Sequence, residues 1–194
     1  ERREALVTEA PALAGLVAAP VVPPRPRRWS LDAGYALVSF PLDGSVEHGV
    51  AVDLRVALGR LVELELGADV VAPVKATRQD VSAIVVAVPI ALRAGVHGSR
   101  GRFQGAIAAI VEALVVSLDA SSASAAVRSD LTAAPGLGLD LSGRVRVAGP
   151  LAVFLEASAV GLLDGPRYFV RGEPLVDLSH LQVGASAGLA VSLW

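Results

Sequence analysis

Charged residues recur on one side of a two-residue repeat, and they are the residues through which this sequence could do chemistry. In the segment 50–59, Asp53 and Arg55 share a face. Glu63 and Glu65 share the matching face of 61–70. Carboxylate and guanidinium groups on adjacent strands can form charge-assisted hydrogen bonds. The full set predicted to point into a common interior is Asp32, Asp53, Arg55, Glu63, Glu65, Asp69, Arg93, Glu112, Asp140 and Glu156.

Charges that face a narrow interior must be paired or hydrated, so we expect these residues to form a structural ion-pair network. A narrow path for water or ions is the alternative.

Residues for catalysis or metal binding are sparse. The chain has three histidines, His48, His97 and His180, and no cysteine. Ser179 and His180 are neighbours and would point to opposite faces of a strand, which disfavours a nucleophile–base pair. Three scattered histidines do not make a metal site. We therefore predict no catalytic residues, no metal and no cofactor.

The elements that position the charged face have the period of β-strands. In 50–59, Val and Leu alternate with Ala, Gly and charged residues, and in 61–70 Val, Leu and Ala alternate with Leu61, Gly and acidic residues. The short Gly59-Arg60 connection predicts a tight hairpin between these two segments.

Six further segments complete eight expected strands. The two faces of 102–117 are almost equally apolar apart from Gln104 and Glu112, so its orientation is ambiguous. The other five are 29–40, 83–93, 131–142, 149–162 and 181–193. We expect periplasmic turns at Gly59-Arg60, 94–101 and 142–148, and external loops at 43–48, 72–80, 118–130 and 163–179.

Composition agrees with a membrane-spanning barrel. The 194 residues are 53% hydrophobic, and the mean hydropathy is +0.57. No window offers the ~18 uninterrupted apolar residues of a membrane helix. We predict an all-β, eight-stranded antiparallel up-and-down transmembrane barrel, in which alternate residues face lipid. The expected lipid-facing set includes Val52, Leu54, Leu64, Val86, Leu139 and Leu189.

A soluble barrel that binds an apolar ligand would also alternate, but three features favour the membrane. The polar face combines small residues with charges of both signs, which suits a narrow lumen. Lys75 is the single lysine, whereas a solvated strand face would carry several. Aromatic residues at predicted strand ends indicate membrane interfaces. They are Trp29, Phe40, Phe103, Tyr168, Phe169 and Trp194.

The chain divides into an arm and a barrel. Residues 1–28 form an Ala- and Pro-rich segment that we expect to be a periplasmic arm or linker, and 29–194 the outer-membrane barrel. The arm would bind a periplasmic or membrane protein. The chain starts at Glu1, so an export signal would have been removed or left out of the numbering. Seventeen basic against nineteen acidic residues leave no basic stripe for nucleic acid.

The strand sequences VAVPIALRAG, TAAPGLGLDL and GPLAVFLEASA, with an aromatic C-terminus, resemble the small outer-membrane β-barrels of Gram-negative bacteria, of the type of the OmpA transmembrane domain. The resemblance covers 29–194 and implies a fold and a location in the cell outer membrane. A structural anchor or interaction component of the cell envelope, alone or within an envelope-spanning complex, is the function we expect. A small pore or a barrel-borne lipid-modifying enzyme is the alternative. The loop 163–179 could contact lipopolysaccharide or a partner.

Overall fold

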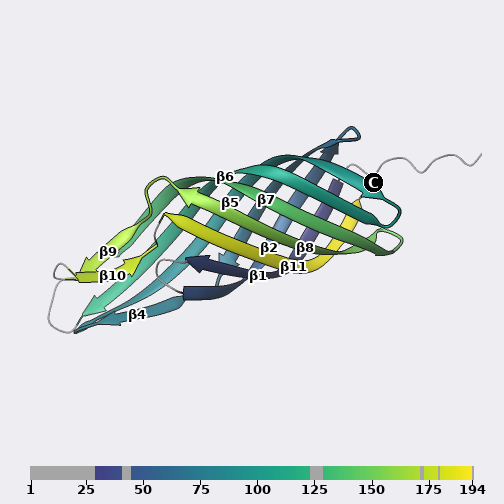
Figure 1. The fold of residues 1–194 in the computed structure, drawn as a ribbon. Helices are drawn as coiled ribbons and strands as arrows, with labels where there is room; N and C mark the ends of the chain where they lie inside the picture. Colours follow the sequence, from purple (N-terminus) through teal and green to yellow (C-terminus); the bar gives the residue numbers. More distant parts are fainter. Residues whose placement is uncertain (1–28, 41–44, 123–128, 171–172, 179, 194) are drawn as a thin grey trace, which may run out of the picture.

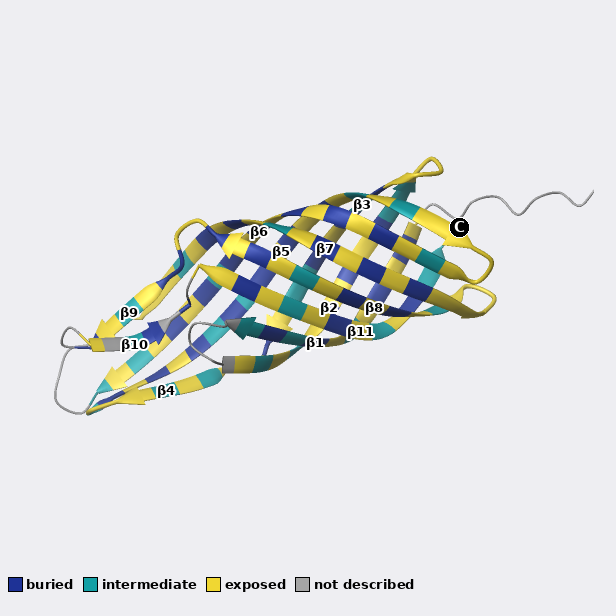
Figure 2. Ribbon diagram, viewed as in Figure 1, coloured by how far each residue is buried: buried dark blue, intermediate teal, exposed yellow. Residues whose placement is uncertain are grey.

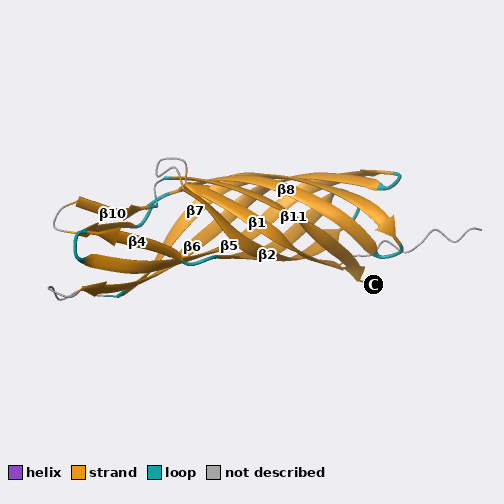
Figure 3. Cartoon of the chain, turned by 90° about the horizontal axis from the view of Figure 1, so that it is seen from below, coloured by secondary structure: helices purple, strands orange, loops and turns teal. Residues whose placement is uncertain are grey.

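The computed structural model describes residues 29–40, 45–122, 129–170, 173–178 and 180–193, so the arm 1–28 lies outside the described residues. These residues form strands joined by turns (Figure 3). Among them, no helix is long and apolar enough to cross a membrane. The strands are β1 (Trp29–Phe40), β2 (Ser45–Leu58), β3 (Val62–Val71), β4 (Val74–Arg78), β5 (Val81–Arg100), β6 (Phe103–Ser122), β7 (Asp130–Ala148), β8 (Leu151–Leu162), β9 (Arg167–Val170), β10 (Glu173–Asp177) and β11 (Leu181–Leu193).

Eight of these strands close into an antiparallel barrel (Figure 1). Sequential neighbours pair from β5 to β8, then β8 pairs with β11, β11 with β1, β1 with β2, and β2 with β3. The pairing of β3 with β5, from Val62 opposite Val96 to Ala68 opposite Ile90, completes the ring. The predicted eight-stranded up-and-down barrel is confirmed, and closure leaves these strands without a free edge in the ring.

One end of the barrel, here called the short-turn end, has three tight turns that each use a glycine at positive φ. These glycines are Gly59, Gly101 and Gly149, with φ of 85°, 63° and 51°. Glycine adopts this backbone conformation without the strain of a side chain. Trp29 pairs with Leu193 at the same end. The Gly59-Arg60 hairpin is therefore confirmed.

Two predicted periplasmic turns were wrong. Residues 94–100 continue β5, and 142–148 continue β7. Their Gly, Ser, His and Arg residues are typical of loops, but each still pairs with the neighbouring strand. Because Gly101 and Gly149 let the chain reverse within two residues, the ladders extend up to the turns themselves.

The opposite end has longer strands and additional ones, and the predicted external loops were too long. Loop 72–80 contains β4, and loop 163–179 contains the β9–β10 hairpin. Strand β2 begins inside the predicted loop 43–48, and β6 runs to Ser122 inside 118–130. Strand β4 takes the place of β3 beside β5 beyond the barrel wall. We call β4, the adjoining ends of β5 and β6, and the β9–β10 hairpin the extension.

Buried and exposed residues alternate along the strands of the wall (Figure 2), so successive side chains point to opposite faces. Val52, Leu139 and Leu189 point outward with exposed fractions of 47%, 62% and 59%. Leu54 is also exposed, and Leu64 and Val86 are half-buried on the same outward parity. The barrel thus has an apolar exterior, as expected for contact with lipid.

The interior is divided into two halves along the barrel axis. The half near the short-turn end holds buried charged residues, while the other half holds an apolar cluster that continues into the extension. On β6 the cluster contains Leu114 and Val116 beyond Glu112, and Ile110 on the other side of Glu112; Leu114 is fully buried. We call this cluster the apolar plug; it includes Val38, Val71, Val85, Leu114, Val116, Val160, Leu162, Val176 and Leu178. The plug explains why both faces of 102–117 are apolar.

Candidate functional site

Arg55, which projects inward from β2, is one centre of the charged interior. It donates a hydrogen bond of 2.8 Å to Glu63 Oε1 and one of 3.2 Å to Ser142 Oγ. It is also paired with Glu65, and its Nη2 lies 3.5 Å from Glu156 Oε2. These partners come from β3, β7 and β8, so one guanidinium joins opposite walls of the barrel.

Arg93 on β5 is the second centre. Its Nη1 lies 2.9 Å from Asp53 Oδ1 and 2.5 Å from Glu65 Oε1, and its Nη2 lies 3.0 Å from Glu156 Oε1. Gly67 lies beside this cluster, and a Cβ added there would overlap Asp53 and Arg93. The glycine therefore provides the space in which the ion pairs form.

Carboxylate oxygens of Asp53, Glu65 and Glu156 lie within 4.8 Å of one another, an arrangement that could hold a metal ion. Arg93 is bonded to all three of these residues. Its guanidinium supplies the positive charge that a bound cation would otherwise supply, so we assign the cluster to ion pairing.

The sequence prediction missed two inward residues, Arg144 and His97. Arg144 on β7 donates to Ser30 Oγ at 2.9 Å and is also paired with Asp32. His97 Nδ1 lies 3.3 Å from Glu63 Oε2. Both lie in segments that we predicted as turns. Extending the alternation of 131–142 and 83–93 by a few residues would have placed both on the polar parity.

The remaining predicted inward carboxylates form no ion pair with Arg55 or Arg93 among the described residues, although Asp69 and Glu112 line a hollow with Arg93. Glu112 and Asp140 are buried, and Asp69 is half-buried on the inward parity of β3. Asp69 and Glu112 line a hollow of about 10 Å³ together with Gln182, which is room for about one water molecule. Eight predicted carboxylates and three arginines face the interior, so its charged half is rich in acid.

Two of the predicted interface aromatics lie at the short-turn end of the wall and two lie in the extension. Trp29 and Phe103 are exposed at the short-turn end, with Phe103 65% exposed. In β9, Phe169 is exposed and Tyr168 is half-buried against the apolar plug. The side chain of Phe40 and all of Trp194 lie outside the described residues.

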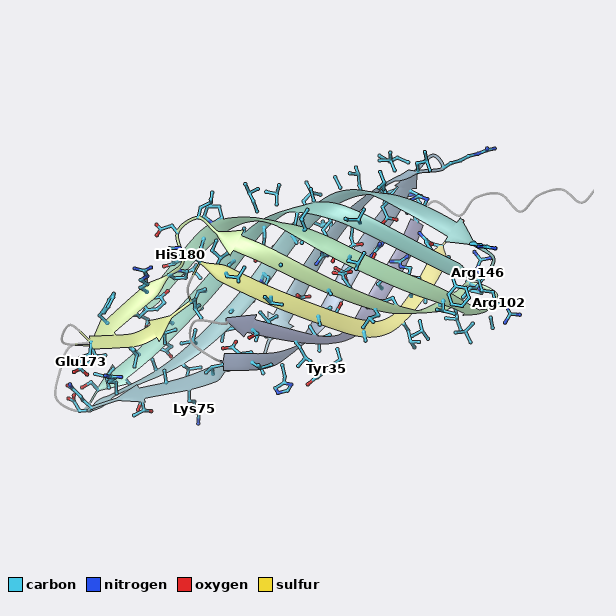
Figure 4. The ribbon with its side chains drawn as sticks, viewed as in Figure 1. Tyr35, Lys75, Arg102, Arg146, Glu173 and His180 are labelled. Atoms are coloured by element: carbon cyan, nitrogen blue, oxygen red, sulfur yellow. The ribbon has the colours of Figure 1, made fainter. Side chains whose placement is uncertain are left out.

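A polar pair that we did not predict lies on the barrel exterior. Tyr35 Oη contacts His48 Nδ1, and the two ring centroids are 5.8 Å apart. Tyr35 points away from the wall (Figure 4). The other rim histidine, His180, has its Nε2 2.7 Å from Arg167 Nη2. Ser179 lies outside the described residues, so the geometry of a serine–histidine pair is not defined.

An apolar exterior around a closed, charged interior inverts the arrangement of a soluble protein. Outward residues such as Leu139 and Leu155 are more than 60% exposed, whereas Asp32 and Asp53 are essentially inaccessible. In water this exterior would be costly, while in lipid it is favourable. Fold and surface together define an integral membrane β-barrel of the small outer-membrane class.

Solved outer-membrane proteins share this fold. Neisserial surface protein A is similar over 85% of this chain and 96% of its own, with a TM-score of 0.54 and 12% identity. The attachment invasion locus protein Ail of Yersinia pestis is similar over 84% of this chain and 96% of its own, with a TM-score of 0.54 and 11% identity. A major outer membrane protein of Thermus thermophilus is similar over 84% of this chain and 98% of its own, with a TM-score of 0.57 and 13% identity. At these identities the likeness establishes the fold.

No protein-family model matches the sequence. No curated protein matches it either.

Proposed function

We propose that this chain is a non-catalytic barrel of the bacterial outer membrane that serves as a structural anchor or interaction component of the cell envelope. The observation that carries the proposal is the double closure of the lumen. Ion pairs centred on Arg55 and Arg93 fill one half, and the apolar plug fills the other. A barrel with a filled interior has its rims, its extension and its arm available for function.

The proposed orientation places the short-turn end in the periplasm and the extension outside the cell. Short periplasmic turns and longer external segments are the usual asymmetry of outer-membrane barrels. The arm 1–28 precedes Trp29, which lies at the short-turn end. We propose that the arm binds a periplasmic or membrane partner, for which its Pro-rich composition suits an extended docking segment.

The extension supplies a second contact surface. The β9–β10 hairpin packs on the β4–β5–β6 sheet through Tyr168, Leu175 and Val176, which leaves Phe169 exposed. Arg78 on β4 and Glu173 on β10 are joined by an ion pair of 2.7 Å between Nη2 and Oε2. Because the hairpin is packed on the sheet and joined to β4 by this ion pair, Phe169 is held in place before a partner binds. Little conformational entropy is then lost on binding.

The chemistry of the extension favours a protein partner over a polyanion. Ail of Yersinia pestis has been crystallised with the heparin analogue sucrose octasulfate. In this chain, the described acidic residues near the extension outnumber Lys75, Arg78 and Arg167. These acidic residues are Asp80, Asp119, Asp130, Asp164 and Glu173.

Site-directed cross-linking in cells tests the proposal. A photoactivatable residue in place of Phe169 should capture a defined envelope protein, whereas the same residue in place of Leu139, on the lipid face, should not. Deleting 1–28 should leave barrel assembly intact and abolish recovery of the periplasmic partner. If neither the extension nor the arm captures a protein, or if Leu139 captures the same one, the interaction role is wrong.

A further inference from the structure

Arginines are concentrated at the short-turn end. Arg60 follows the turn glycine Gly59, Arg100 and Arg102 flank Gly101, and Arg146 lies near the end of β7. All four are exposed. None takes part in an ion pair with a described residue. Glu63, three residues after Arg60, is buried and already bonded to Arg55.

Arg102 and Arg146 are held next to each other by the backbone. The Arg146 amide donates a hydrogen bond of 2.9 Å to the Arg102 carbonyl, which links the β5–β6 turn to β7. Adjacent strands lie roughly 5 Å apart, and both side chains project from the same end of the barrel (Figure 4). Two guanidiniums on adjacent strands, neither of them ion-paired with a described residue, repel each other, and an anion that accepts hydrogen bonds from both relieves that repulsion.

The outward face of the wall next to the arginine pair is apolar, whereas Arg102 and Arg146 lie on the opposite strand parity and are exposed at the rim. Phe103 pairs with Val145 on the outward face, and both are exposed. Val147, next to Arg146, is 60% exposed. A ligand for this place therefore needs an anionic group for the arginines and an apolar part for the wall. A soluble anion satisfies the first requirement alone.

We propose that Arg102 and Arg146 form a binding site for the phosphate of an anionic diacyl phospholipid, whose chains lie against Phe103 and Val145. Arg60 and Arg100 raise the positive potential of the same rim, which favours lipids of net negative charge over zwitterionic ones. The inference rests on the proposed membrane location and adds to it a lipid preference at one end of the barrel.

Bromine quenching of a single tryptophan tests this site in the full chain. Trp29→Phe, Trp194→Phe and Phe103→Trp together leave one tryptophan beside the arginine pair. The barrel is inserted into phosphatidylcholine vesicles that contain brominated phosphatidylglycerol or, in parallel, brominated phosphatidylcholine. A basic residue beside an anionic headgroup favours it about fivefold, so we expect association with phosphatidylglycerol to be at least about fivefold stronger.

The matched variants isolate the arginine pair. R102S/R146S should bring the ratio close to one, and R102K/R146K should retain most of it. K75S/R78S removes two positive charges from the extension and should leave the ratio unchanged. The preference should also fall at 1 M salt, where the Debye length is about 3 Å.

Several results would overturn the site: no preference in the reporter protein, no loss in R102S/R146S, or an equal loss in R102K/R146K or K75S/R78S. Displacement of the lipid by millimolar glycerol phosphate would exclude a lipid as the ligand. Failure of the barrel to insert into vesicles would instead contradict the proposed membrane location, whereas insertion without a preference would contradict the lipid site alone.

Discussion

At the scale of single residues, the charged interior depends on arginines that each serve several carboxylates. Arg93 is bonded to Asp53, Glu65 and Glu156, and all four residues are buried. Removing one member of such a group leaves the others charged and without compensation, which costs more than the pair contributes when intact.

We therefore expect Arg93→Leu to lower the free energy of unfolding by about 3–5 kcal/mol. Urea-induced unfolding in detergent micelles, followed by tryptophan fluorescence, measures the change. Arg102→Leu at the exposed rim is the matched control and should change stability by no more than about 0.5 kcal/mol. Similar losses in the free energy of unfolding for both variants would mean that the buried ion pairs of Arg93 do not contribute more to stability than an exposed arginine does.

The inward parity of these residues could be predicted from the sequence, but their pairing could not. Alternation placed Asp32, Asp53 and Arg93 on one face of their strands. Which carboxylate meets which arginine across the lumen depends on the stagger between strands and on barrel closure. The space at Gly67, on which the Asp53–Arg93 pair depends, likewise appears when the strands are assembled.

At the scale of the strand, the two faces of the wall meet different surroundings, and those surroundings change along the axis. The outward side chain of Leu139 on β7 is 62% exposed, and its neighbours Leu137 and Leu141 share that face. Alternation in the sequence predicted this face well. It failed on 102–117 because β6 borders lipid outside and the apolar plug inside, so neither side has to be polar.

We expect Leu139→Arg to destabilise the barrel in a bilayer by about 2–4 kcal/mol, because a charge near mid-strand lies deep in the apolar layer. Leu163→Arg is the control. Leu163 is 67% exposed but follows the last residue of β8, so the same change there should cost about 0–1 kcal/mol. Unfolding in phospholipid vesicles ranks the variants. Equal costs at both positions would show that the apolar band does not cover the middle of β7.

At the scale of the whole molecule, the lumen has two barriers of different chemistry in series. The ion pairs bridge the charged half, with hollows of about 50 Å³ at its short-turn mouth and about 10 Å³ beside Glu112. Beyond Glu112, the apolar plug packs side chains from several strands and from the β9–β10 hairpin. Water and ions would have to pass both barriers, and an apolar constriction excludes them even without steric contact.

The charged half was predictable from sequence, whereas the plug was not. The plug residues lie on the same inward parity as the charged residues. Val and Leu at those positions were equally compatible with a strand whose inward and lipid-facing sides were exchanged. Val176 and Leu178 join the plug from a segment that we predicted as loop. Such a contribution depends on how the hairpin folds back over the barrel.

The serial arrangement predicts that opening the charged half alone does not create a pore. The purified wild-type barrel in a planar bilayer should give no steady single-channel current, and R55A/R93A should also stay closed because the apolar plug, including the fully buried Leu114, persists. Gel mobility before and after heating confirms that the R55A/R93A protein used is folded. A steady current in the wild type would support the pore alternative. A current that arises in R55A/R93A would instead mean that the ion pairs are the sole barrier and that the plug does not exclude water.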